Sequence, residues 1–156
     1  MVFLDPFGAS VEWKVIRALA RTKAVDLWIL FPYAAINRML VSDAMPPKAW
    51  AERLTRIFGT EEWKEKFYAT DSWRSLIDED KKVERVYKTA DQEQITQFFI
   101  DRLRGEFAAV AQPGFLHNSR GSLLFVLLFA AGNAKGANAG IRIANDLLME
   151  LNKSAF

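Results

Sequence analysis

The sequence contains no cysteine and a single histidine, His117. The absence of cysteine excludes disulfides and thiolate metal sites, and one histidine leaves little for a zinc centre. We therefore expect no metal site. A chain without cysteine is also consistent with the reducing cytoplasm, which is where we expect the protein to act.

Excess charge of one sign and long apolar runs are also missing. The formal net charge is +2, from 21 basic and 19 acidic residues, which is too mild to indicate nucleic-acid binding by itself. The longest apolar run, 122–131, is far shorter than the ~20 residues that a membrane helix needs. No basic segment precedes an apolar run at the N-terminus, so we expect neither a signal peptide nor membrane association.

The chain does have an ordinary globular composition. Its 156 residues are 51% hydrophobic and include 12 Phe and five Trp. This length is enough for one compact domain with a core, and large aromatic side chains should dominate its packing. No repeat or linker divides the chain, so we predict a single domain over 1–156.

The apolar segments predict an α/β fold that begins β-α-β. Residues 2–5 and 25–31 have the unbroken apolar character of central parallel strands, and Pro32 should end the second. Between them, Ser10 is a candidate helix cap. Apolar side chains follow it at helical spacing: Val11, Val15, Ile16 and Leu19.

The middle of the chain predicts a helical insertion, about 42–90. Helices are expected over 34–40, after Pro46-Pro47 and after Thr60. Their apolar residues are Trp50, Leu54, Ile57 and Phe58, then Trp63 and Phe67, with Gly59 as a C-cap. Residues 70–89 are charged, and we expect an exposed, partly helical excursion, with a lid or partner surface as the alternative.

The last third predicts a long helix, a strand pair and a final helix. Asp91 and Gln94 have the spacing of a capping box, and the apolar pattern behind them continues to Val110. Strands are expected over 115–118 and 122–131, joined by a tight turn. A small-residue loop, 132–140, then leads to a helix over 141–152 with a buried face of Ile141, Ala144, Leu147, Leu148 and Leu151. The sheet is thus expected to be mixed.

Asp5, Pro6 and Phe7 form the strongest candidate site. In open α/β sheets, ligands bind beyond the carboxyl ends of strands, where these residues are expected. The Asp5 carboxylate and the Pro6 carbonyl could accept hydrogen bonds from an amino group while Phe7 stacks on a planar base. Gly8 would allow a ligand to approach the backbone. A simple strand-to-helix turn, with Asp5 as a cap and Phe7 in the core, is the alternative.

Three further polar segments are weaker candidates. The glycines of 132–140 lack the spacing of phosphate-binding loops, which favours a turn with close helix packing. His117 lies near Ser119 and Ser122, but no G-x-S-x-G elbow is present, which favours a surface role. The carboxylates of 78–80 lack the spacing of a calcium loop.

Several short motifs together resemble the three-Cys-motif partner proteins (TcmP): residues 3–8, 23–28, 30–32 with Asn37-Arg38, 118–121 and 128–133. The resemblance covers nearly the whole chain but corresponds to the C-terminal part of that family. It implies a partial Rossmann-like fold of the S-adenosylmethionine-dependent methyltransferase superfamily. Asp5, Pro6 and Phe7 would then take the place of the Asp-Pro-Pro-aromatic motif of amino-methylating enzymes, at the end of the fourth strand.

The same resemblance limits the expected activity. In such enzymes S-adenosylmethionine binds a Gly-rich loop after the first strand and an acidic residue after the second, and neither has a counterpart here. We therefore expect no ordinary methyltransferase activity from this chain alone. The strand over 2–5 would become an apolar edge, which predicts a homo-oligomer through that strand. The alternatives are a non-enzymatic module acting with a partner protein or nucleic acid, and a hydrolase using Asp5 with a metal.

Overall fold

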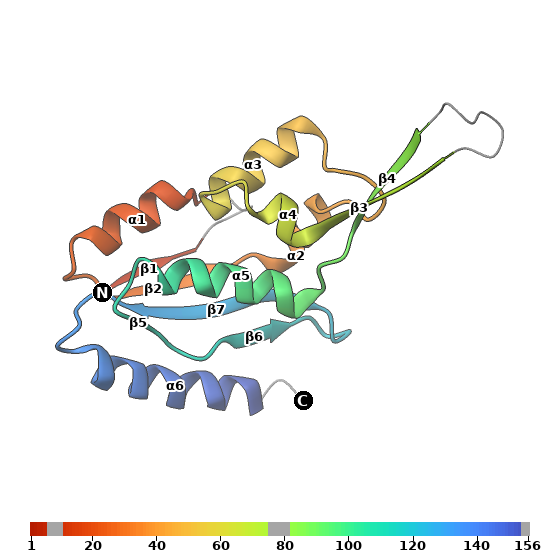
Figure 1. Ribbon diagram of the computed structural model, residues 1–156. Coiled ribbons are helices and arrows are strands. Elements are labelled where there is room, and N and C mark those ends of the chain that lie inside the picture. Colours follow the sequence, from red (N-terminus) through yellow and green to blue (C-terminus); the bar gives the residue numbers. More distant parts are fainter. Residues whose placement is uncertain (6–10, 75–81, 154–156) are drawn as a thin grey trace.

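The computed structural model describes residues 1–5, 11–74 and 82–153, and it is an α/β fold with the predicted β-α-β start (Figure 1). The elements, in chain order, are β1 (Val2–Leu4), α1 (Trp13–Arg21), β2 (Leu27–Phe31), α2 (Tyr33–Met39), α3 (Lys48–Phe58), α4 (Trp63–Phe67), β3 (Tyr68–Arg74), β4 (Lys82–Lys88), α5 (Gln92–Arg104), β5 (Ala109–Val110), β6 (Gly114–His117), β7 (Leu123–Ala131) and α6 (Ala137–Lys153).

The main sheet is mixed, as predicted. β1 is parallel to β2, with Val2 beside Leu27, whereas β2 is antiparallel to β7. β5 and β6 both pair with β7. The alternate residues Leu27, Ile29 and Phe31 of β2 are buried, as expected for a strand covered by helices. In the described part of the chain no strand pairs with the outer side of β1, so β1 is an edge.

Helices cover both faces of this sheet (Figure 1). α1, α3, α4 and α5 lie on one face and α6 lies on the other. The larger core lies beneath the first group, and aromatic rings dominate it as predicted. Phe99 of α5 stacks on Phe31 of β2 with 4.3 Å between ring centroids, and Phe58 of α3 contacts both rings. A smaller core of alanines, Phe129 and Leu148 lies beneath α6.

The segment expected to be partly helical over 70–89 is an antiparallel hairpin, so that prediction was wrong. β3 and β4 pair from Tyr68 beside Lys88 to Arg74 beside Lys82. The hairpin projects from the body of the molecule (Figure 1). Its β-branched and aromatic residues favour strands, but the charged stretch between them obscured that pattern. Part of that stretch, including 78–80, lies outside the described residues. The helices expected earlier in the insertion are present as α3 and α4.

The long helix ends earlier than predicted. Its capping box is confirmed, because the Gln94 amide donates to Asp91 Oδ1 at 2.9 Å and the Asp91 amide donates to Gln94 Oε1 at 3.0 Å. The helix stops at Arg104, before Gly105, which has a low helix propensity. Ala109 and Val110 instead form β5, because the end of β7 offers an unpaired edge there.

Some helix faces also differ from the prediction. The buried residues of α1 are Trp13, Ile16 and Ala20, while Val15 is exposed. Trp50 is exposed on α3, and Leu147 is exposed on α6, which begins at Ala137, four residues earlier than expected. In each case the apolar residue lies at the margin of the buried face, where residue type alone does not decide burial.

The strand pair at the end of the sheet is confirmed. β6 and β7 are joined by a turn in which Asn118 Oδ1 accepts hydrogen bonds from the amides of Arg120 and Ser122, each at 2.9 Å. Gly121 has a φ of +78°, a conformation that glycine adopts readily. Among the helices of the described ranges, none has the length and apolar character needed to cross a membrane.

Candidate functional site

Asp5 lies directly after β1, and its side chain is exposed. Because β1 and β2 are parallel, their carboxyl ends meet at the same edge of the sheet, and Asp5 is at that edge. Pro6, Phe7 and Gly8 lie outside the described residues. The role of Asp5, Pro6 and Phe7 in binding a ligand therefore stays a prediction.

The glycine-containing loop after β7 packs closely, as expected. The Gly132 amide donates to Asp26 Oδ1 at 3.1 Å, and a Cβ atom at Gly132 would overlap the Val25 carbonyl oxygen. A Cβ at Gly140 would lie 3.4 Å from the Phe129 ring. Close packing therefore explains why glycine occupies positions 132 and 140.

The other polar candidates are dispersed on the surface. His117 ends β6, and it is exposed together with Ser119 and Ser122. Within residues 1–5, 11–74 and 82–153, no three His, Asp or Glu side chains are grouped in a way that could hold a metal ion.

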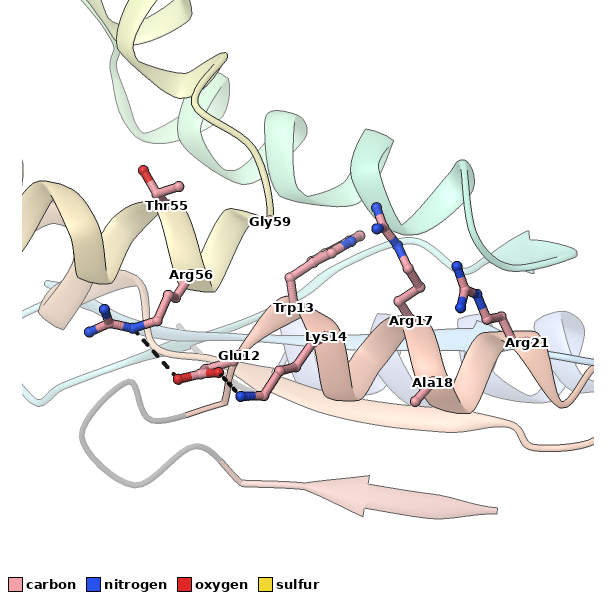
Figure 2. A pocket seen from close by; sticks show the side chains of 9 residues that line it. All are labelled: Glu12, Trp13, Lys14, Arg17, Ala18, Arg21, Thr55, Arg56 and Gly59. Atoms are coloured by element: carbon pink, nitrogen blue, oxygen red, sulfur yellow. Dashed lines mark ion pairs between the residues drawn. The ribbon is translucent and has the colours of Figure 1, made fainter.

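A cationic pocket lies between α1 and α3, and the sequence analysis did not identify it (Figure 2). Its volume is about 450 Å³. We call it the α1–α3 pocket; its lining consists of one carboxylate, four cations and four neutral residues, namely Glu12, Lys14, Arg17, Arg21, Arg56, Trp13, Ala18, Thr55 and Gly59.

Ion pairs neutralise part of the positive charge of the α1–α3 pocket. Glu12 accepts from Lys14 Nζ at 2.6 Å and lies 3.5 Å from Arg56 Nε, which links the start of α1 to α3. The hydrogen bond from Lys14, with the nearby positive charges, lowers the pKa of Glu12, so this carboxylate is ionised at neutral pH. Arg17 Nε donates to Glu106 Oε1 at 2.9 Å.

Trp13 forms the inner wall of the pocket and is only 2% exposed. Phe99 packs edge-to-face against the indole, and the Arg102 guanidinium lies 4.9 Å from the ring centroid. Arg102 also donates to the carbonyl oxygens of Phe58 and Gly59. The Trp13 Nε1–H is buried and has no hydrogen-bond partner among the described residues.

The sequence did contain a signal for this pocket. Lys14, Arg17 and Arg21 recur at spacings of three and four residues, which places them along one side of a helix. Cations near the C-terminal end of a helix also complement its dipole, so this spacing alone does not indicate a pocket. The contribution of α3 could not be anticipated, because the packing of α3 beside α1 depends on the tertiary structure.

Fold and geometry together define this chain as an α/β protein with a mixed sheet and a cationic pocket beside its first helix. No protein-family model, curated protein or solved structure matches the chain. Functional proposals therefore depend on its own residues.

Proposed function

We propose that this chain is a binding module built on the C-terminal half of a methyltransferase-like fold, without methyl transfer of its own. The observation that carries the proposal is the strand arrangement. A parallel β1-α1-β2 unit is followed by a terminal hairpin whose second strand, β7, inserts antiparallel beside β2. The resemblance to the three-Cys-motif partner proteins includes such a final hairpin, and it assigns Asp5 to the end of the fourth strand.

The glycine pattern supports the second half of the proposal. These 156 residues contain no G-x-G-x-x-G segment, whereas the enzymes that the chain resembles bind S-adenosylmethionine on a Gly-rich loop. We therefore propose that these residues act by binding rather than by catalysis.

Calorimetric titration with S-adenosylmethionine tests this proposal. We expect no saturable heat at concentrations up to about 1 mM, the upper end of ordinary substrate affinities. Saturable heat that Asp5→Asn removes would instead support a working cofactor site and contradict the proposal. Asp146→Asn is the matched control, because Asp146 is an exposed aspartate on α6, across the sheet.

The edge strand β1 supports self-association of this module. The Val2 amide donates to the Asp26 carbonyl at 2.8 Å, and alternate residues of a strand face the same neighbour. The N–H and C=O groups of Phe3 therefore point toward the open side of β1. An antiparallel pairing that places Phe3 opposite Phe3 of a second copy would satisfy both groups about a twofold axis.

Light scattering on the purified protein tests this pairing. We expect a dimer, and we expect Phe3→Lys to give a monomer, because two lysines about 5.5 Å apart across the pair would repel each other. Ile143→Lys is the control, since Ile143 is 58% exposed on α6 and Phe3 is 59% exposed on β1. A wild-type monomer at high concentration, or equal effects of the two variants, would contradict the pairing.

A further inference from the structure

We infer that the α1–α3 pocket binds a phosphate group. This inference goes beyond the proposed function and does not depend on it, because neither the cofactor test nor the strand pairing involves these residues. The evidence is the charge of the pocket, its unused donors and its volume.

The charge of the lining is strongly unbalanced. Four cations, Lys14, Arg17, Arg21 and Arg56, face one carboxylate, Glu12. Glu12 already contacts two of the cations, and Glu106 neutralises a third from outside the pocket. The Arg21 side chain makes no hydrogen bond or ion pair with the residues that the structure describes. Like charges gathered in this way attract an anion into the pocket.

Donors remain available after these ion pairs are counted. Arg17 uses Nε for Glu106, and Arg56 directs Nε toward Glu12. Their terminal Nη groups make no hydrogen bonds in the described parts of the chain. Figure 2 shows Arg17 and Arg21 extending from α1 one turn apart, with Arg56 reaching from α3 toward Glu12. Guanidinium groups suit this role because their paired N–H groups match the oxygens of a phosphate.

The Trp13 indole can report on binding in this pocket. Its Nε1–H is buried and has no hydrogen-bond partner among the described residues. In the view of Figure 2 the indole nitrogen is at the end of the ring toward Arg17, which follows Trp13 by one helical turn. A phosphate held by Arg17 would therefore change the surroundings of the indole and shift its N–H resonance.

The shape of the pocket favours recognition of the phosphate over recognition of a base. Its volume of about 450 Å³ is within the range of small-molecule sites. Phe99, Arg102 and Gly59 already contact the Trp13 ring, so a nucleobase cannot stack on it. The phosphate can come from a small phosphorylated molecule or from the backbone of a nucleic acid, and the experiment separates these sources.

The first measurement titrates the protein with inorganic phosphate and follows the indole N–H resonances by NMR, with Trp13→Phe identifying the signal of Trp13. We expect a saturable shift of that signal. Arg21→Gln should weaken binding about tenfold, the value of one charge-assisted hydrogen bond. Arg142→Gln removes the same charge from α6 on the opposite face of the sheet, and it should leave the affinity unchanged.

The second measurement replaces inorganic phosphate by a short single-stranded RNA in a salt series. Tighter binding than inorganic phosphate, with a salt slope that Arg21→Gln and Arg56→Gln reduce and Arg142→Gln does not, supports a nucleic-acid backbone as the source. Binding of inorganic phosphate alone supports a small phosphorylated molecule. Absence of saturation with both probes, or equal loss in Arg142→Gln and the pocket variants, overturns the inference.

Discussion

Replacing Gly59 with alanine should lower the free energy of unfolding by about 3 kcal/mol. Gly59 ends α3 with a φ of +70°, and its amide donates to the Thr55 carbonyl at 2.8 Å. A Cβ atom there would lie 2.6 Å from Trp13 Cβ and overlap the indole atoms Cγ and Cδ1. Trp13 cannot move aside easily, because Phe99 and Arg102 pack against it.

Urea unfolding of Gly59→Ala and Gly121→Ala separates the two causes of this effect. Gly121 has a similar φ of +78°, but a Cβ atom there would meet nothing within 4 Å. Gly121→Ala should therefore show only the backbone strain, roughly 1–2 kcal/mol. The difference between the variants measures the overlap with Trp13. Equal destabilisation by the two substitutions would show that Trp13 does not pack on Gly59.

Much of the fold could be predicted because local signals agreed with the tertiary structure. The Asp91–Gln94 capping box, the C-cap at Gly59 and the pairing of β6 with β7 each depend on a few neighbouring residues. β1 and β2 were found from apolar runs that a sheet between helices requires. In these places residue type and spacing restrict the backbone directly.

The errors occur where partners distant in sequence decide the outcome. Phe107 is buried although α5 ends at Arg104, and the unpaired end of β7 selects β5. The hairpin β3–β4 was missed because charged residues suit exposed strands as well as exposed helices. Similarly, a single sequence pattern on α1 could not show that Arg56 of α3 lies beside its cations.

The candidate sites show the same contrast between features set by neighbouring residues and features set by partners distant in sequence. The position of Asp5 at the carboxyl end of the first strand agrees with the sequence analysis, since it depends only on the strand that precedes it. The α1–α3 pocket required two helices to pack, with Gly59 providing the close approach to Trp13. Local sequence patterns therefore predict single elements better than they predict the sites that form between elements.

Gly132→Ala should also destabilise the fold strongly, by about 2–3 kcal/mol. Gly132 follows β7, and its backbone lies against Val25, the residue before Asp26. An added Cβ atom would overlap the Val25 carbonyl oxygen and lie 3.0 Å from its carbonyl carbon. Backbone atoms cannot change rotamer, so relief would require β7 to move away from β2. That movement would also lengthen the hydrogen bond from the Gly132 amide to Asp26 Oδ1.

Gly136→Ala in the same loop is the matched control for this prediction. A Cβ atom at Gly136 would meet nothing within 4 Å, so this substitution should change stability by no more than about 0.5 kcal/mol. Thermal and urea unfolding of the two variants measure the contrast. Comparable stability of the two variants would contradict the close contact between Gly132 and the Val25 backbone, because that contact is what distinguishes Gly132 from Gly136.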